Sequence, residues 1–288
     1  MKRTLLPAIV LVFLTGCHTM NGRPTIGSVK TADGVPIAYE TRGRGETTLV
    51  FVHCWCCDRA FWHNQMDEFA RDYRVVAVDL AGFGESGKVR EKWSIAKLGE
   101  DVATLIDKLG LKRVVIIGHS LGGPVSLEAA RLTAGRTIGV VLVDTLQDVE
   151  MEYPANLLEQ IATRFENDFE GTMEELVHGM FPPDANQEVV KFVLDKAKAQ
   201  DQKAAVAVFR GFLDFDRKAA FTAARVPIRA INAIPHPPRG VKTAIETNRK
   251  YADFDAVFMD GVGHYLQLER PEEFNQLLRE ILEKMDTR

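Results

Sequence analysis

Val114-Val115-Ile116-Ile117-Gly118-His119-Ser120-Leu121-Gly122-Gly123 is the stretch of this chain that decides its fold. Its first four residues are apolar and β-branched, which predicts a buried strand, and the residues after it predict a helix over 120–134. The chain therefore passes from strand to helix through one sharp, glycine-flanked turn. A serine on such a turn projects from the end of a sheet, and the following helix N-terminus offers backbone N–H groups to an oxyanion. Ser120 is the candidate nucleophile.

The same alternation of strand and helix extends in both directions from this turn. Further strands are expected at Thr48–His53, Arg74–Val78, Thr137–Asp144, Ile228–Asn232 and Ala256–Met259, and further helices at Ala60–Arg71, Ser94–Leu109, Val241–Tyr251 and Pro271–Lys284. A hairpin of Val29–Thr31 with Ile37–Thr41 is expected to open the domain. Because several strands are apolar on both faces, the pattern predicts an α/β fold with a mostly parallel central sheet and helices on both faces.

One long stretch, residues 145–224, interrupts the alternation. It contains no convincing strand, only amphipathic segments at Leu157–Phe169, Met173–Met180 and Val189–Phe212. We expect a helical cap here, inserted between the two parts of the core, residues 29–144 and 225–288. The aromatic residues Phe209, Phe212 and Phe215 either line an apolar acyl pocket or pack in the core of the cap, since their spacing fits both roles.

The N-terminus has the pattern of an export signal. A basic start, Lys2-Arg3, is followed by the apolar stretch Leu5–Leu14 and by small residues, which predicts a signal segment over 1–20 and a tether over 21–28. The apolar stretch is too short to span roughly 30 Å of hydrocarbon as a helix.

Leu14-Thr15-Gly16-Cys17 resembles the bacterial lipobox. The resemblance implies cleavage before Cys17, diacylation of its thiol, and a lipoprotein that faces the periplasm and is anchored to a membrane through this lipid. His18 follows the cysteine, which by the same resemblance favours the outer membrane. An ordinary secretory signal with an incidental cysteine is the alternative.

Four short motifs resemble, in order, those of the α/β-hydrolase family. They are Phe51-Val52-His53, Asp79-Leu80-Ala81-Gly82-Phe83-Gly84-Glu85-Ser86, Gly118-His119-Ser120-Leu121-Gly122-Gly123 and Gly263-His264. The resemblance runs from about Val29 to the end of the chain. It implies the α/β-hydrolase fold with a cap, and hydrolysis by an activated serine, which needs no metal or organic cofactor.

A serine hydroxyl needs a base to take its proton, and the chain has seven histidines. His264 follows the last predicted strand through a glycine-containing loop that can lay its imidazole across the end of the sheet. A histidine that comes last in the chain also fits the family order. We therefore expect His264 to be the general base. By resemblance, His53 belongs to a His-Gly turn and His119 has a structural place.

The acid that orients this histidine is not where the family usually has it. That place follows the strand Ile228–Asn232, where Ala233-Ile234-Pro235-His236-Pro237-Pro238 contains no carboxylate. Some family members, notably haloalkane dehalogenases, have the acid after the preceding strand instead, and this chain has Asp144 and Asp148 there. Asp144 is the favoured acid because it ends its strand, and Asp148 is the alternative.

The oxyanion hole is expected to combine the N–H of Leu121 with that of Trp55, the residue that matches x in the family's His-Gly-x turn. Cys54 stands in place of the glycine, and its side chain would strain the backbone if φ there must be positive. Cys54, Cys56 and Cys57 cannot all pair within one chain. Export permits one disulfide among them, and burial as small side chains is the alternative.

The composition excludes some function classes. The chain has 288 residues, a net charge of −4 and no long basic run, so nucleic acid is not the expected partner. The spacing of the cysteines does not suit a metal site. The residues favour a serine esterase that acts on a small or medium apolar ester through an acyl-enzyme on Ser120. A ligand-binding or sensing protein of the same fold with low turnover is the alternative.

Overall fold

The computed structural model describes residues 24–286, apart from 153, 155, 213 and 235–242. The expected signal segment, Cys17 and the first part of the expected tether lie outside the described residues. So do Pro235-His236-Pro237-Pro238 and the expected start of a helix at Val241.

An eight-stranded sheet in the order β1-β2-β4-β3-β5-β6-β7-β8 forms the centre of the described chain. The strands are β1 (Thr25–Lys30), β2 (Pro36–Arg42), β3 (Thr47–Val52), β4 (Arg74–Val78), β5 (Arg113–His119), β6 (Thr137–Val143), β7 (Ile228–Ala233) and β8 (Phe254–Met259). Strands β3 to β8 run parallel to one another, and β2 pairs antiparallel with both β1 and β4. The predicted α/β fold with a mostly parallel sheet is confirmed.

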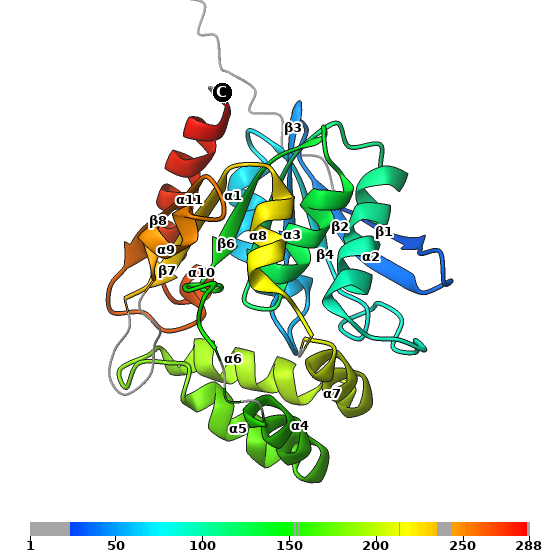
Figure 1. The fold of residues 1–288 in the computed structure, drawn as a ribbon, viewed down its shortest axis with the longest axis vertical. Coiled ribbons are helices and arrows are strands. Elements are labelled where there is room, and N and C mark those ends of the chain that lie inside the picture. The colour runs from blue at the N-terminus through cyan, green and yellow to red at the C-terminus, as the bar shows by residue number, and fades with distance from the viewer. Residues whose placement is uncertain (1–23, 153, 155, 213, 235–242, 287–288) are drawn as a thin grey trace, which may run out of the picture.

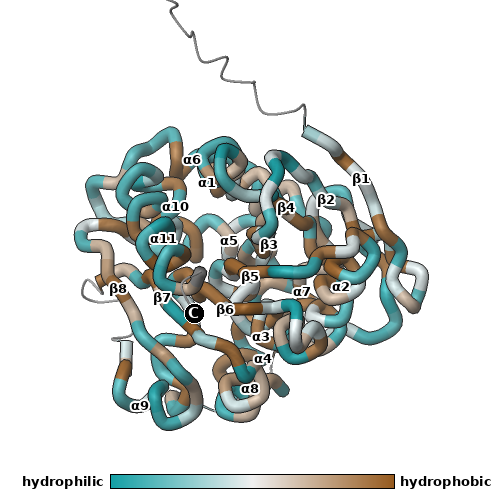
Figure 2. Tube along the Cα trace, turned by 90° about the horizontal axis from the view of Figure 1, so that it is seen from above, coloured by the Kyte–Doolittle hydropathy of each residue, from teal (hydrophilic) through white to brown (hydrophobic). Residues whose placement is uncertain are grey.

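Helices cover both faces of the sheet (Figure 1). Alternate residues of β3 point to opposite faces, so Val50 and Val52 pack on one side and Leu49 and Phe51 on the other. The first side carries α2 (Ile95–Lys108), α3 (Gly122–Leu132) and α8 (Arg217–Ala224), and the second α1 (His63–Phe69) and α11 (Pro271–Asp286). Figure 2 shows the apolar residues concentrated along the central strands between these layers.

Three short elements complete the core: the 3-10 helix η1 (Arg59–Trp62), α9 (Ile245–Arg249) and α10 (Leu266–Glu269). Among the residues that the structure describes, no helix is both long enough and apolar enough to cross a membrane.

The cap lies across the end of the sheet and is formed by α4 (Leu157–Asn167), α5 (Phe169–His178), α6 (Gln187–Lys198) and α7 (Gln202–Arg210) (Figure 1). The amphipathic segment expected at Val189–Phe212 is divided between two helices, because Asp201 starts a new one: its carboxylate accepts the N–H of Ala204 at 2.8 Å. Helix α8 lies inside the range 145–224 that was expected to form the cap, but it packs against α3 and so belongs to the core.

The domain begins earlier than the sequence pattern indicates. Strand β1 starts at Thr25, inside the range expected to be a tether, and Thr25 pairs with Thr41 of β2. This edge strand is held by backbone hydrogen bonds while most of its side chains are exposed, so it lacks the apolar alternation that marks a strand.

Candidate active site

Ser120 lies on the sharp turn between β5 and α3. Its φ is +52°, in the left-handed region that is uncommon for serine. Its N–H donates to the carbonyl oxygen of Val143 at 3.0 Å, and its own carbonyl accepts the N–H of Gly123 at 2.9 Å. The turn packs tightly, because a Cβ at Gly122 would lie 2.3 Å from the carbonyl oxygen of Val52. These contacts fix the sharp turn that the sequence predicts in a strained conformation, with the serine at the carboxyl end of the sheet.

His264 reaches the same end of the sheet from the loop after β8. Its Nδ1 lies 2.7 Å from Oδ2 of Asp144. Its backbone N–H donates to the carbonyl oxygen of Met180, after helix α5, at 2.8 Å. The preceding Gly263 permits this approach, since a Cβ there would lie 2.2 Å from the same oxygen. The position of the imidazole is therefore set by an acid in the core and by the cap.

Asp144 follows β6 directly and has a φ of +45°, a region that aspartate enters more readily than most residues. While Oδ2 faces His264, Oδ1 accepts the backbone N–H of Ala233 at 3.1 Å and the side-chain amide of Gln147 at 3.3 Å. Three donors thus hold one carboxylate in a fixed plane. Asp148 lines the same cavity, but its Oδ1 accepts the N–H of Glu150 at 2.9 Å, and it has no hydrogen bond to His264.

His119 is fully buried beneath His264, and its ring centroid lies 4.6 Å from that of His264. Its Nε2 lies 2.8 Å from the carbonyl oxygen of His264, and its Nδ1 lies 3.2 Å from the side-chain amide nitrogen of Gln267. A carbonyl only accepts, so Nε2 carries the proton and Nδ1 accepts from the amide. Burial holds the pKa of His119 well below its usual range, and the neighbouring His264 lowers it further. His119 is a neutral support for the histidine loop.

Glu269 supports the same loop from the other side. Its carboxylate accepts the N–H of Gly263 at 2.9 Å and that of Tyr265 at 3.1 Å, so it holds the backbone on both sides of His264. Burial raises the pKa of Glu269. The sequence analysis gave Glu269 no role, because the only feature that marks it in the sequence is a carboxylate shortly after His264.

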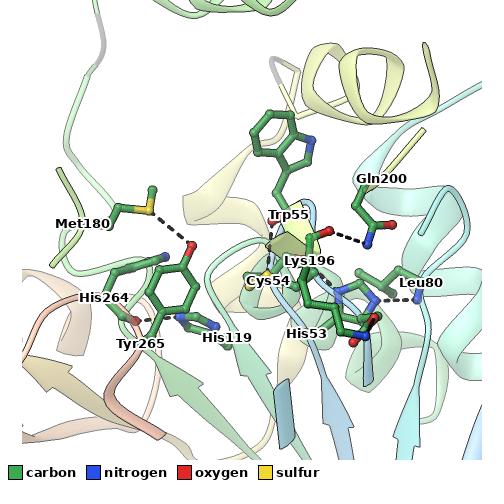
Figure 3. The surroundings of a disulfide bond; sticks show 12 residues. His53, Cys54, Trp55, Leu80, His119, Met180, Lys196, Gln200, His264 and Tyr265 are labelled. Carbon is green, nitrogen blue, oxygen red and sulfur yellow. Dashed lines mark hydrogen bonds and ion pairs between the residues drawn. A yellow bond between two sulfur atoms is a disulfide. The ribbon is translucent and has the colours of Figure 1, made fainter. Parts of the chain in front are cut away.

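The loop that carries the second expected oxyanion donor starts with a buried histidine. His53 Nδ1 donates to the carbonyl oxygen of Cys54 at 2.7 Å, and Nε2 accepts the N–H of Leu80 at 2.9 Å, while burial lowers the pKa of the ring (Figure 3). Cys54 and Cys57 form a disulfide and Cys56 is a free, buried thiol. The positive φ of this loop is at Cys56, +54°, and not at Cys54, so the strain considered for Cys54 does not arise.

A cavity of about 290 Å³ lies between the cap and the end of the sheet. Its lining includes the candidate residues Ser120, Leu121, Trp55, Asp144, Asp148 and His264, and also Thr145, Leu146, Gln147, Met151, Phe209, Phe212 and Arg217. Phe209 and Phe212 therefore line the pocket, whereas Phe215 stacks on Phe212 with a centroid separation of 6.1 Å and is not part of the lining.

The sequence analysis missed four lining residues, because their places depend on how the cap packs on the core. They are Leu146, Gln147, Met151 and Arg217.

Within the described ranges, no group of three or more histidine, cysteine, aspartate or glutamate side chains could hold a metal ion. The chemistry that this arrangement can perform is nucleophilic attack by Ser120, with His264 and Asp144 moving and stabilising the proton.

The sequence of this chain is similar to those of several known proteins. The model of the Alpha/beta hydrolase family matches residues 49–277. An acetyltransferase component of the acetoin cleaving system of Cupriavidus necator is 33% identical over 111 residues, 38% of this chain and 30% of that protein. A bifunctional esterase/perhydrolase of Acinetobacter calcoaceticus is 31% identical over 134 residues, 46% of this chain and 49% of that protein. The chain thus spans less than half the length of either relative.

Among solved structures, a thermophilic esterase from Thermogutta terrifontis is similar with a TM-score of 0.78 and 24% identity, over 91% of this chain and 99% of that one. At this identity the likeness concerns the fold.

Proposed function

Because this chain belongs to the α/β-hydrolase family, we propose that it is a serine hydrolase that cleaves carboxylic esters through an acyl-enzyme on Ser120. The observation that carries the proposal is the 2.7 Å contact between His264 Nδ1 and Asp144 Oδ2, in the same cavity as Ser120. A nucleophile, a base and an acid that orients the base are the parts that hydrolysis by a serine requires.

The reaction follows from this geometry. With its Nδ1–H donated to Asp144, His264 presents Nε2 as the nitrogen that takes the proton of Ser120. The serine oxygen then attacks the ester carbonyl, and the resulting oxyanion is bound by the N–H groups of Leu121 and Trp55. Collapse of this intermediate expels the alcohol, which receives the proton from His264. Water, activated by the same histidine, then releases the acid from Ser120.

Neither expected oxyanion donor has another partner in the described structure. No backbone hydrogen bond from the N–H of Leu121 or of Trp55 is present among the described residues, and both residues line the cavity. Leu121 immediately precedes helix α3, so the N-terminal dipole of that helix adds to the stabilisation of negative charge.

The cavity supports a small or medium apolar ester as substrate. Its volume of about 290 Å³ is at the lower end of the usual range for small-molecule sites. Trp55, Phe209 and Phe212 supply aromatic walls, which suit an acyl chain or an aryl alcohol.

We also propose that the mature protein is an exported lipoprotein, anchored to the outer membrane through a lipid on Cys17. The motif Leu14-Thr15-Gly16-Cys17 supports this proposal. Mass spectrometry of the N-terminal peptide is expected to show a diacylated Cys17, and processing is expected to stop in the presence of globomycin. An unlipidated protein cleaved well after Cys17 would refute the anchor.

The direct test of the activity is turnover of p-nitrophenyl acetate and butyrate by protein that lacks the first 20 residues. We expect measurable turnover by the wild type and by Ser28→Ala, a control at an exposed position on β1. Ser120→Ala is expected to lose at least about 1,000-fold in kcat. Equal rates for the wild type and Ser120→Ala would exclude the esterase and favour a binding or sensing protein of the same fold.

A further inference from the structure

The Cys54–Cys57 disulfide lies directly beside the candidate oxyanion hole. It joins residues three apart, with their Cα atoms 5.3 Å from each other, and therefore encloses Trp55 and Cys56 in a small ring. Trp55 follows Cys54 in this ring (Figure 3), and it lines the cavity that contains Ser120. Both disulfide-bonded residues are buried, with 2% and 1% of their surface exposed. A bridge in this place constrains the backbone that carries the Trp55 N–H.

The two ends of this ring are anchored by other contacts. At the start, His53 binds the carbonyl oxygen of Cys54. At the end, Asp58 begins the helix η1 by accepting the N–H of Ala60 at 2.9 Å, and its other oxygen is 2.7 Å from Lys196 of the cap. Between these anchors the backbone must pass through the left-handed conformation at Cys56, which is unfavourable for a residue with a side chain.

The side chain of Trp55 is held by the cap and not by the loop. Its indole N–H donates to the carbonyl oxygen of Ala205 in α7 at 2.8 Å. Its ring packs edge-on against those of Phe165 and Phe209, with centroid separations of 4.7 and 5.3 Å, respectively. Figure 3 shows the indole directed from the loop toward the cap. These contacts fix the side chain against the cap, whereas the proposed role as oxyanion donor requires the backbone N–H to face the cavity. The disulfide is the covalent constraint on the backbone of Trp55, which lies between the two bonded cysteines.

We propose that the Cys54–Cys57 disulfide is a positioning element for the oxyanion donor of Trp55, and that full hydrolytic activity requires it to be oxidised. This inference rests on the proposed serine hydrolase function. In the reduced state the S–S bond is replaced by two thiols, the ring opens, and the Trp55 N–H loses its fixed direction. Disulfides persist in oxidising compartments, so the proposal also links activity to export of the chain.

The third thiol does not compete for this bridge. Cys56 is buried, and burial raises the pKa of its thiol well above the usual range. Thiol–disulfide exchange requires the thiolate, so a protonated Cys56 does not attack the neighbouring disulfide. Burial of Cys56 and the raised pKa of its thiol therefore both disfavour rearrangement of the Cys54–Cys57 pairing in the folded protein.

The test compares the full-length wild type with Cys54→Ser/Cys57→Ser, which removes the bridge, and with Cys56→Ala, which removes only the free thiol. Loss of one oxyanion donor costs about 100- to 1,000-fold in kcat, and a donor that is loosened rather than lost costs less. We expect kcat for p-nitrophenyl butyrate to fall about 10- to 100-fold in the double variant, with KM within about twofold. Cys56→Ala is expected to keep the wild-type kcat.

A second measurement separates this role from a merely structural one. An aryl trifluoromethyl ketone adds to the serine and places an oxyanion in the hole, so its inhibition constant should rise by the same factor by which kcat falls. The double variant should therefore lose affinity for this ketone without losing affinity for the ester. An inhibition constant that equals that of the wild type would overturn the proposal.

Reduction of the wild type covers the case in which the double variant does not fold. Dithiothreitol reduces the bridge to two thiols and is itself oxidised to its cyclic disulfide. We expect kcat to fall as the thiols of Cys54 and Cys57 become titratable, and to return on reoxidation. The inference is overturned if kcat is unchanged in reduced wild type whose Cys54 and Cys57 thiols are both titratable, or if kcat is unchanged in the folded double variant. Either result leaves the hydrolase proposal intact. A wild type no faster than Ser120→Ala overturns both.

Discussion

Replacing Asp144 by asparagine tests the role of the acid with almost no change in shape. In the wild type, Oδ1 accepts the N–H of Ala233 and Oδ2 accepts the Nδ1–H of His264. The asparagine side chain has only one acceptor oxygen, and the backbone N–H of Ala233 requires an acceptor. The amide NH₂ is then directed toward His264, whose Nδ1 must become the acceptor. The proton moves to Nε2, the nitrogen that has to receive the proton of Ser120.

The size of the effect follows from this change of tautomer. A histidine held in the wrong tautomer typically costs about 10,000-fold in kcat, which corresponds to about 5.4 kcal/mol of transition-state stabilisation. The fold should persist, because asparagine tolerates the positive φ of this position and the hydrogen bond to Ala233 is kept. We therefore expect a thermal unfolding midpoint within a few degrees of the wild type.

The assay is the steady-state turnover of p-nitrophenyl butyrate by Asp144→Asn and by a matched control, Asp148→Asn. Asp148 lines the same cavity without a bond to His264, so its variant should keep kcat within about tenfold of the wild type. A large loss of kcat in Asp148→Asn, together with a kcat near that of the wild type in Asp144→Asn, would refute the assignment of Asp144 as the acid.

The other predictions concern the base, a buried histidine and the turn. His264→Asn should lower kcat at least about 1,000-fold, whereas His178→Asn, at an exposed position in the cap, should not change it; similar rates for both variants would contradict the role of the base. His119 has a lowered pKa in the folded state, so below a pH of about 6.5 the unfolded chain binds a proton that the folded chain does not. The free energy of unfolding should fall as the pH falls through this range, by up to about 1.4 kcal/mol per pH unit. His119→Gln removes the titratable ring while keeping a donor for the carbonyl oxygen of His264, and should reduce this slope in denaturant titrations between pH 7 and 5; an unchanged slope would show that His119 does not contribute. Gly122→Ala places a Cβ 2.3 Å from the carbonyl oxygen of Val52 and should lower the free energy of unfolding by about 3 kcal/mol, measured by urea denaturation; wild-type stability would contradict the tight packing of the turn.

The parts of the fold that were predictable from sequence are those with a local signal. The buried strand before Ser120 and the helix after it are marked by a run of β-branched residues, a glycine-rich turn and helix formers. His264 and Asp144 were predicted from the resemblance to the α/β-hydrolase family, through their order in the chain and their places after predicted strands. The structure brings both to Ser120 because parallel strands have their carboxyl ends at one edge of the sheet.

The remaining features depend on tertiary contacts that have no local signature. Helix α8 follows the cap helices within the range that has no predicted strand, and only its packing on α3 assigns it to the core. The edge strand β1 is held by backbone pairing, so its exposed side chains resemble a linker. Which two of the three neighbouring cysteines pair is set by the path of the loop, with its left-handed turn at Cys56.

Mass spectrometry of the reacting enzyme is the most direct test of the central claim, that Ser120 forms an acyl-enzyme. The protein is mixed with p-nitrophenyl butyrate, quenched in acid during turnover, and digested. We predict the added mass of one butyryl group on the peptide that contains Ser120, and no such adduct in Ser120→Ala. A butyryl group on another residue, or hydrolysis at the wild-type rate by Ser120→Ala, would contradict the account.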